Sequence, residues 1–267
     1  MPDSDLQFAI RIARRAGEVM KSHLGASAET KADGTPVTRI DRQINAMVGD
    51  AVLARGDLML GEEDAHHTGA TAGRLWVCDP IDGTWLYAAG VPASVFSLAL
   101  VEDGVPVLGV VNDPWTGRLI HARSGQGAFV DERRTTVNTA GDVAGACLVL
   151  MGRRVPAFDT VRLFAQALEA DAAVVTTGSA VHDAVMVALG FAAGTVYPYT
   201  SPWDMAAAAV IVTEAGGRIS DLNGAAQRYD GPINGAVISN GRVHDQLVRM
   251  VATASNGRQY DANPDIQ

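Results

Sequence analysis

The chain has 267 residues, of which 48% are hydrophobic and 19% are charged, and its net charge is −9. This composition excludes a disordered protein and leaves room for one large domain or two closely packed lobes. The acidic balance provides no basic surface for nucleic acid or for an anionic membrane, so neither is an expected partner.

The cysteines and the N-terminus indicate where the chain resides. Cys78 and Cys147 lie in apolar runs, which predicts free thiols and not a disulfide framework. The start, MPDSDLQFAI, lacks the basic and apolar regions of a secretory signal. No apolar run approaches the roughly 18 residues that a membrane-spanning helix needs. We therefore expect a cytoplasmic protein.

In the first half of the chain, helical patterns precede a series of strands. Residues 5–24 and 41–55 place apolar side chains at helical spacing, and Ser4 or Asp5 can cap the first helix. Between them, KADGTPVTRID reads as a loop with a short extended piece. Glu102-Asp103-Gly104 is a hairpin turn. The predicted strands are LMLGEED at 58–64, 75–78, 94–101, 105–111, 118–122 and 127–131.

From about residue 140 the pattern changes to alternating strands and helices. CLVLMG and AAVVTTG are strands with a helix at 158–170 between them, which is a βαβ pattern. Further helices are predicted at 179–194, 203–216 and 243–253, and GRISDLNG and GAVISN are closing strands. We expect an α/β fold with an N-terminal α+β lobe over 1–140, a C-terminal α/β lobe over 141–254 and a polar tail over 255–267.

Acidic residues follow several of the predicted strands or begin predicted helices. In layered α/β folds, strand ends and helix starts gather at one edge, where binding sites form. Carboxylates that converge there need a cation, and an all-oxygen set of ligands suits Mg²⁺ better than zinc. The acids in such positions are Asp41, Glu62, Glu63, Asp64, Asp79, Asp82 and Asp204, with Glu63 and Asp64 favoured as solvated neighbours.

The segment DPIDGT at 79–84 contains the groups that metal-assisted phosphate chemistry needs, although Pro, Asp and Gly are also ordinary turn residues. Asp79 and Asp82 can ligate ions, and the carbonyl of Ile81 can face them. Gly83 lets the backbone approach a ligand, and a helix that begins at Gly83-Thr84 would offer N–H groups to phosphate. The hydroxyl of Thr84 can position a water. Two metals beside a phosphate describe phosphoryl hydrolysis.

Four sequence blocks, in this order, resemble the inositol monophosphatase family, which includes histidinol-phosphate and bisphosphate-nucleotide phosphatases. They are PVTRID at 36–41, GEE at 61–63, DPIDGT at 79–84 and WDMAAAAVIVTEAGG at 203–217. The resemblance extends over most of the chain. It implies an αβαβα sandwich of the inositol monophosphatase and fructose-bisphosphatase type, a homodimer, and dependence on two or three Mg²⁺ ions.

The resemblance also implies roles for single residues. The metal ligands would be Glu62, Asp79, the Ile81 carbonyl, Asp82 and Asp204. Gly83 and Thr84 would bind the phosphate through backbone N–H groups. Asp41 would hydrogen-bond Thr84, and Thr84 together with Glu62 would orient a metal-activated water for in-line attack on phosphorus. Ser179 and Tyr197 are the expected substrate contacts. For Asp41 and Asp204, capping of a helix is an alternative interpretation.

The surroundings of the expected substrate site depart from the family pattern. Most relatives continue after DPIDGT with Asn-Phe, whereas this chain has WLYAA at 85–89. Relatives that act on inositol phosphates or histidinol phosphate often have a glutamate seven residues before Asp204. This chain has Tyr197 there and no acid in 195–203. Arg118 stands where many relatives have a glutamate.

These departures concern the substrate and leave the metal ligands unchanged. The loss of a carboxylate removes an attraction for a cationic amine, which weakens the histidinol-phosphate interpretation, and removes an acceptor for polyol hydroxyls. Tyr197, Tyr199 and Trp85 could instead offer an aromatic wall to a sugar ring or a base. A specialised substrate of a biosynthetic pathway is therefore a further hypothesis.

The leading hypothesis is a Mg²⁺-dependent phosphomonoesterase for a small polyol, sugar or amino-alcohol phosphate. A phosphatase for a nucleotide or sugar bisphosphate is the alternative within the same class, and Arg118, Arg153 and Arg154 are its candidate groups for a second phosphate. A non-catalytic metal-binding regulator is the alternative from another class. His66-His67 suggests a transition metal, but no further His or Cys stands at ligand spacing.

Overall fold

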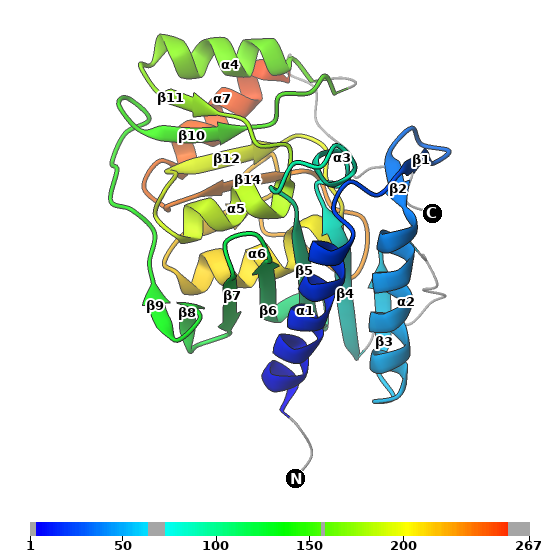
Figure 1. Cartoon of the computed structure of the whole chain (residues 1–267). Coiled ribbons are helices and arrows are strands. Elements are labelled where there is room, and N and C mark those ends of the chain that lie inside the picture. The colour runs from blue at the N-terminus through cyan, green and yellow to red at the C-terminus, as the bar shows by residue number, and fades with distance from the viewer. Residues whose placement is uncertain (1–3, 64–72, 156–157, 256–267) are drawn as a thin grey trace.

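The computed structural model describes residues 4–63, 73–155 and 158–255, and its strands form two large sheets and a short ribbon (Figure 1). The larger sheet has the order β3 (Leu58–Gly61), β4 (Arg74–Asp82), β5 (Val95–Glu102), β6 (Val105–Asp113), β7 (Arg118–Arg123), β8 (Gly127–Val130) and β9 (Arg133–Thr135). The smaller sheet has the order β11 (Ala173–Val175), β10 (Cys147–Leu150), β12 (Gly194–Tyr197), β14 (Ala236–Ser239) and β13 (Arg218–Ser220). The ribbon pairs β1 (Ala28–Thr30) with β2 (Pro36–Thr38).

Helices fill the three layers around the two sheets (Figure 1). The larger sheet carries α1 (Asp5–Ser22) and α2 (Arg39–Leu53) on its outer face. Between the sheets lie α5 (Ala180–Ala188) and α6 (Pro202–Glu214), and the smaller sheet carries α4 (Thr160–Glu169) and α7 (His244–Ala254) on its other face. A short helix, α3 (Thr84–Ala88), follows β4. The predicted αβαβα sandwich is confirmed.

The apolar core divides into three clusters that match the layer boundaries. Met20, Ile44 and Trp76 belong to the cluster between the outer helices and the larger sheet. Leu148 and Leu247 belong to the cluster between the smaller sheet and the pair α4 and α7. The central cluster combines residues from both sides of position 140, because α5 and α6 pack against both sheets.

The alanine-rich sequence of α6 follows from its central position. Residues 205–212 of this helix are buried, so no face of it needs polar side chains. Gly109 of β6 lies directly against the helix, since a Cβ at that position would come within 2.6 Å of the Ala207 carbonyl oxygen. Small residues on both elements therefore let α6 approach the sheet closely, with Asp204 in its first turn.

Most predicted elements are present within a few residues of the predicted bounds. Ser4 caps α1, and β10, α4 and β11 form the predicted parallel βαβ unit. The hairpin between β5 and β6 turns at Asp103 and Gly104, whose φ angles of 51° and 83° are those of a two-residue turn with left-handed residues. Among the described residues, no helix combines the length and the apolar character that crossing a bilayer requires.

Two predicted bounds differ from the structure for physical reasons. The strand predicted to end at Cys78 continues to Asp82, and its register with β5 shifts between Asp79 and Asp82, because Pro80 has no N–H for a regular ladder. The helix predicted at 179–194 ends at Ala188, and residues 194–197 form β12 in the middle of the smaller sheet. A strand buried on both faces is uniformly apolar, so periodicity does not separate it from a buried helix.

Candidate active site

The pairing of β3 with β4 brings their acidic ends to one edge of the larger sheet. The two strands are parallel, with Gly61 opposite Cys78, and the N–H of Glu62 donates to the Cys78 carbonyl at 3.2 Å. Glu62 therefore leaves the sheet beside the point where β4 reaches Asp79. Parallel strands end at the same edge, which is why the sequence rule predicted this convergence.

Three of the predicted ligands converge at that edge. One carboxylate oxygen from each of Asp79, Asp82 and Asp204 lies within 4.8 Å of the other two. Asp79 and Asp82 are 1% and 7% exposed, so water does little to screen their charges. Ile81, between them, is buried, and its N–H donates to Asp79 Oδ1 at 3.0 Å. The bulge at Pro80 thus holds both aspartates on one side.

Glu62 lies near these three acids but forms an ion pair with a lysine. Lys31, from the loop after β1, places its Nζ 2.8 Å from Glu62 Oε1 and 2.7 Å from Glu63 Oε1. Burial raises the pKa of Glu62 to about 8, with Lys31 opposing the shift and the charges of Glu63 and Asp204 adding to it. Sequence reasoning missed Lys31, and it predicted Glu63 as a solvated neighbour, whereas Glu63 is half-buried on Lys31.

Asp41 makes both of the contacts that the sequence allowed as alternatives. The N–H of Thr38 donates to its Oδ2 at 2.9 Å, which completes a capping box at the start of α2. The hydroxyl of Thr84 lies 3.1 Å from its Oδ1 and 2.9 Å from the Ile81 carbonyl oxygen. Thr84 is therefore held between Asp41 and the carbonyl of Ile81. Asp41 is fully buried, and burial raises its pKa.

Gly83 occupies a position that a larger residue would not tolerate. Its φ of 86° is left-handed, and a Cβ there would lie 3.1 Å from the Cβ of Ser179. The glycine allows the chain to turn from β4 into α3 in contact with the start of α5. Thr84, the first residue of α3, follows directly, so the backbone N–H groups of this turn lie next to Asp82.

Asp82 is held by the first turn of α5. Its Oδ1 accepts from the N–H of Ala180 at 3.0 Å, and its Oδ2 accepts from the N–H of Val181 at 2.8 Å and from the hydroxyl of Ser179. Burial and the charge of Asp204 raise the pKa of Asp82 to about 7, although these hydrogen bonds oppose the shift. Ser179, an expected substrate contact, is fully buried in this arrangement.

Tyr197 lies behind the same turn. Its hydroxyl donates to Asp183 Oδ2 at 2.5 Å, and the hydroxyl of Thr177 donates to Asp183 Oδ1. Burial raises the pKa of Asp183 to about 6 against these two hydrogen bonds. Tyr197 and Asp183 are both buried, and sequence reasoning did not find this pair. A direct contact of Tyr197 or Ser179 with substrate stays a prediction.

The electrostatics of the cluster fit a divalent cation. Burial raises the pKa of Asp79 well above its ordinary value, and the charges of Glu62, Asp82 and Asp204 add to this effect. Burial also raises the pKa of Asp204. Carboxylates that hold protons when no cation is present release them when a metal binds. The donor atoms are all oxygens, which is the set that Mg²⁺ prefers.

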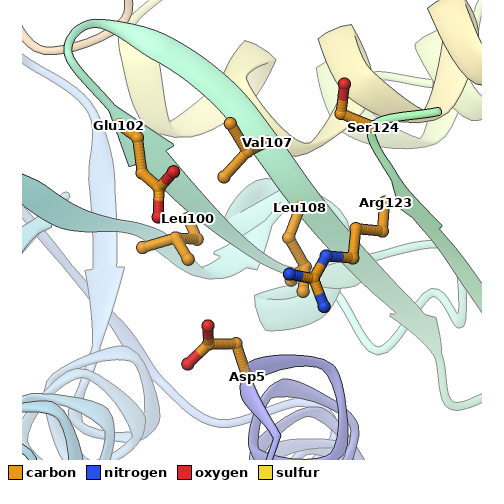
Figure 2. Close-up of a pocket in the computed structure, with 7 residues that line it drawn as sticks. All are labelled: Asp5, Leu100, Glu102, Val107, Leu108, Arg123 and Ser124. Carbon is orange, nitrogen blue, oxygen red and sulfur yellow. The ribbon is translucent and has the colours of Figure 1, made fainter.

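Several other predicted groups lie elsewhere. The guanidinium of Arg118 is 5.7 Å from the ring centroid of Phe191, and Arg153 and Arg154 are exposed. Asp64 and His66-His67 lie outside the described residues. A surface hollow lies at the opposite end of the strands, between the start of α1 and the ends of β5 and β7 (Figure 2). It is lined by Asp5, Leu100, Glu102, Val107, Leu108, Arg123 and Ser124, none of which was predicted for the site.

Comparison with known proteins agrees with this geometry. A family model described as "Inositol monophosphatase family" matches residues 1–256. A histidinol-phosphatase of Mycobacterium tuberculosis is 36% identical, with 93% of this chain and 98% of the relative covered. A fructose-1,6-bisphosphatase/inositol-1-monophosphatase of Thermotoga maritima is 32% identical, with 92% and 95% covered.

Solved structures agree as well. An IMPase of Thermotoga maritima superposes with a TM-score of 0.86 at 30% identity, over 94% of this chain and 98% of its own. The family model covers nearly the whole chain, and the fold matches that of a solved IMPase. The cluster of three carboxylates agrees with the metal dependence of this family. The chain belongs to the inositol monophosphatase family and is a Mg²⁺-dependent phosphoric monoester hydrolase that acts on small phosphorylated substrates.

Proposed function

We propose that the carboxylate cluster at the end of β4 is the catalytic centre and that it hydrolyses the monophosphate ester of a small polyol, sugar or related alcohol. The observation that carries the proposal is the approach of Asp79, Asp82 and Asp204 to within 4.8 Å of one another. The Thr84 hydroxyl lies at the same edge of the sheet, 3.1 Å from Asp41. The acids and the hydroxyl come from three separate segments of the chain, at Asp41, at 79–84 and at Asp204.

The proposed metal ligands are Glu62, Asp79, the Ile81 carbonyl, Asp82 and Asp204, and they would hold two or three Mg²⁺ ions. The position of Glu62 favours more than one ion. Glu62 lies outside the set of three acids, yet the charge of Asp204 helps to raise its pKa. When bound, Mg²⁺ neutralises charge on the phosphoryl group and lowers the pKa of water. Such an ion would replace the ammonium group of Lys31 at the Glu62 carboxylate.

The residues around the phosphate divide the remaining tasks. The backbone N–H groups of Gly83 and Thr84 would hold phosphate oxygens. Thr84 donates its proton toward Asp41, so its oxygen can accept a hydrogen bond from the attacking water, and the Glu62 carboxylate can take the proton that this water loses. The water oxygen then bonds to phosphorus as the P–O bond to the alcohol breaks. The leaving alkoxide takes a proton from a water molecule and the proton on Glu62 returns to solvent, so the products are the free alcohol and inorganic phosphate.

The names of the relatives support several substrates for this chemistry. They include a histidinol-phosphatase and a fructose-1,6-bisphosphatase/inositol-1-monophosphatase. A second phosphate, as in a bisphosphate, would need a cation nearby, and Arg118 is a candidate whose guanidinium lies 5.7 Å from the Phe191 ring centroid. A bisphosphatase of a specialised pathway therefore stays the second candidate function.

The test is phosphate release with and without Mg²⁺ from inositol phosphates, histidinol phosphate, sugar phosphates and bisphosphates, and nucleoside monophosphates. We expect turnover only with Mg²⁺, and a loss of at least about 10³-fold in Asp204→Asn, because a ligand carboxylate is removed. Asp245→Asn, whose side chain is 76% exposed and ion-paired with Arg218, is the matched control and keeps wild-type turnover. Wild-type turnover by a folded Asp204→Asn protein would overturn the assignment of the site.

Two further expectations belong to the proposal. We infer a homodimer from the family resemblance, and light scattering that gives one chain per particle would contradict it.

We also infer a cytoplasmic location, which the free thiols of Cys78 and Cys147 support because oxidising compartments favour disulfides. Cell fractionation tests this location, and recovery of the protein outside the cytoplasm would contradict it.

A further inference from the structure

We propose that Trp85 and Tyr199 form an aromatic rim at the catalytic centre and that the enzyme therefore prefers phosphate esters whose alcohol carries a ring with a flat face. The shared chemistry is a face that stacks on an aromatic side chain, which both a nucleobase and a pyranose ring offer. The inference rests on the proposed function, since it places the rim beside the cluster of Asp79, Asp82 and Asp204.

The first argument is that the segment from β12 to α6 carries no accessible negative charge. No acid occupies residues 195–203, and Tyr197 is only 4% exposed. The nearest carboxylate behind it, Asp183, is fully buried and accepts hydrogen bonds from Tyr197 at 2.5 Å and from Thr177. A carboxylate that is buried and already bonded does not attract a cationic substrate. Recognition of the alcohol must therefore use other groups.

The second argument is the position of two exposed aromatic residues along the chain. Trp85 directly follows Thr84, whose hydroxyl lies 3.1 Å from Asp41. Tyr199 directly precedes Thr200, whose hydroxyl donates to Asp204 Oδ2 at 2.7 Å. Neighbouring Cα atoms are about 3.8 Å apart, so the backbone of each aromatic residue lies beside a threonine that hydrogen-bonds to an acid of the proposed site. They come from different elements, α3 and the connection from β12 to α6 (Figure 1).

The third argument is that these side chains are left open to solvent. Trp85 is 66% exposed and Tyr199 is 48% exposed, although both are large and could bury much apolar area. Aromatic faces stack on bases and on sugar rings with little regard to hydrogen-bonding pattern. An aromatic rim beside a phosphate site therefore favours an alcohol that carries a ring.

The experiment compares kcat/KM for a ring-bearing ester with kcat/KM for glycerol 2-phosphate, which has no ring. Adenosine monophosphate and glucose 1-phosphate are the two ring-bearing esters, so the test separates a base from a sugar. We expect Trp85→Ala and Tyr199→Ala each to lower the ratio for the preferred ester about tenfold. Phe191→Ala is the matched control, because Phe191 is also an exposed aromatic residue, at 54%. It follows the C-terminal end of α5, whereas the N-terminal end of this helix contacts Asp82.

The outcomes are distinct. A fall of the ratio in both rim variants, an unchanged ratio in Phe191→Ala and recovery in Trp85→Phe and Tyr199→Phe would support the rim. A ratio that is unchanged in both alanine variants, or a wild-type enzyme without preference for either ring-bearing ester, would overturn it. Failure of the proposed catalytic centre would look different, because full Mg²⁺-dependent turnover would then persist in Asp204→Asn whatever the ester.

Discussion

Replacing Asp79 by asparagine should stabilise the metal-free protein while it abolishes turnover. Asp79 is buried beside Asp82 and Asp204, and burial together with these like charges raises its pKa well above the ordinary value. An asparagine keeps the shape of a protonated carboxyl group. Its carbonyl can still accept from the Ile81 N–H, now 3.0 Å from Asp79 Oδ1, and its amide can donate to a neighbouring carboxylate.

The magnitude follows from the spacing of the acids. Two unit charges separated by 4.8 Å, the limit that contains these three oxygens, repel by about 3.5 kcal/mol at an effective dielectric constant of 20. Hydrogen bonds to Asp82 and Asp204 from the starts of α5 and α6 already offset part of this repulsion. We therefore expect Asp79→Asn to raise the free energy of unfolding of the metal-free protein by about 1–3 kcal/mol, or the melting temperature by about 3–10 °C.

The assay is thermal unfolding at pH 8 with a chelator and again with excess Mg²⁺. The wild-type protein should gain stability from Mg²⁺, whereas Asp79→Asn should gain little and should lose at least about 10³-fold in turnover. Asp57→Asn is the matched control, because Asp57 accepts from Trp76 Nε1 at 2.9 Å and from Arg74 Nε at 3.1 Å, and its loss should destabilise. A metal-free Asp79→Asn protein that is less stable than wild type would refute the electrostatic reasoning.

Two more predictions concern the buried residues Ser179 and His244. Ser179→Ala should raise the Mg²⁺ concentration for half-maximal turnover about tenfold, because Asp82 loses a hydrogen-bond donor. Ser94→Ala is the control and should not change this concentration, because the Ser94 hydroxyl has no hydrogen-bond partner among the described residues. A rise in KM for the ester alone would instead make Ser179 a substrate contact. Burial and the charge of Arg218 lower the pKa of His244 to about 4, and the charge of Asp245 opposes this shift. As pH falls, the unfolded state therefore binds a proton at this histidine before the folded state does. The wild-type protein should lose about 3 kcal/mol of stability from this effect between about pH 6.5 and 4, whereas His244→Gln should not. Equal pH profiles of the two proteins in thermal unfolding would contradict this.

The convergence of acids at one edge could be predicted because it follows from topology. Parallel strands end together, so a carboxylate after β3 and another after β4 must be neighbours once the strands pair. The continuation of β4 to Asp82 could not be predicted in the same way. Pro, Asp and Gly favour a turn locally, and only the pairing of Asp82 with Val95 on β5 shows that the strand resumes after its bulge.

The partners of the site residues were harder to predict than the residues themselves. The ion pair of Lys31 with Glu62 joins a loop to a strand end, and no periodicity in the sequence relates the two. The hydrogen bond of Tyr197 to Asp183 depends on how β12 lies against α5, and the sequence pattern had assigned the start of β12 to the helix. Long-range contacts of this kind need the packed structure.

The helices α2, α5 and α6 each begin with a hydrogen bond to an acid of the proposed site, and this explains why capping and metal binding need not exclude each other. Asp41 caps α2 through Oδ2 and faces Thr84 with Oδ1. Asp204 accepts from the Ser201 N–H at the start of α6 through Oδ2, and one of its carboxylate oxygens belongs to the cluster. Asp82 accepts from the first turn of α5. Each helix N-terminus stabilises a nearby negative charge by about 0.3–1 kcal/mol, so the helices offset part of the repulsion that the proposed metal ions would relieve.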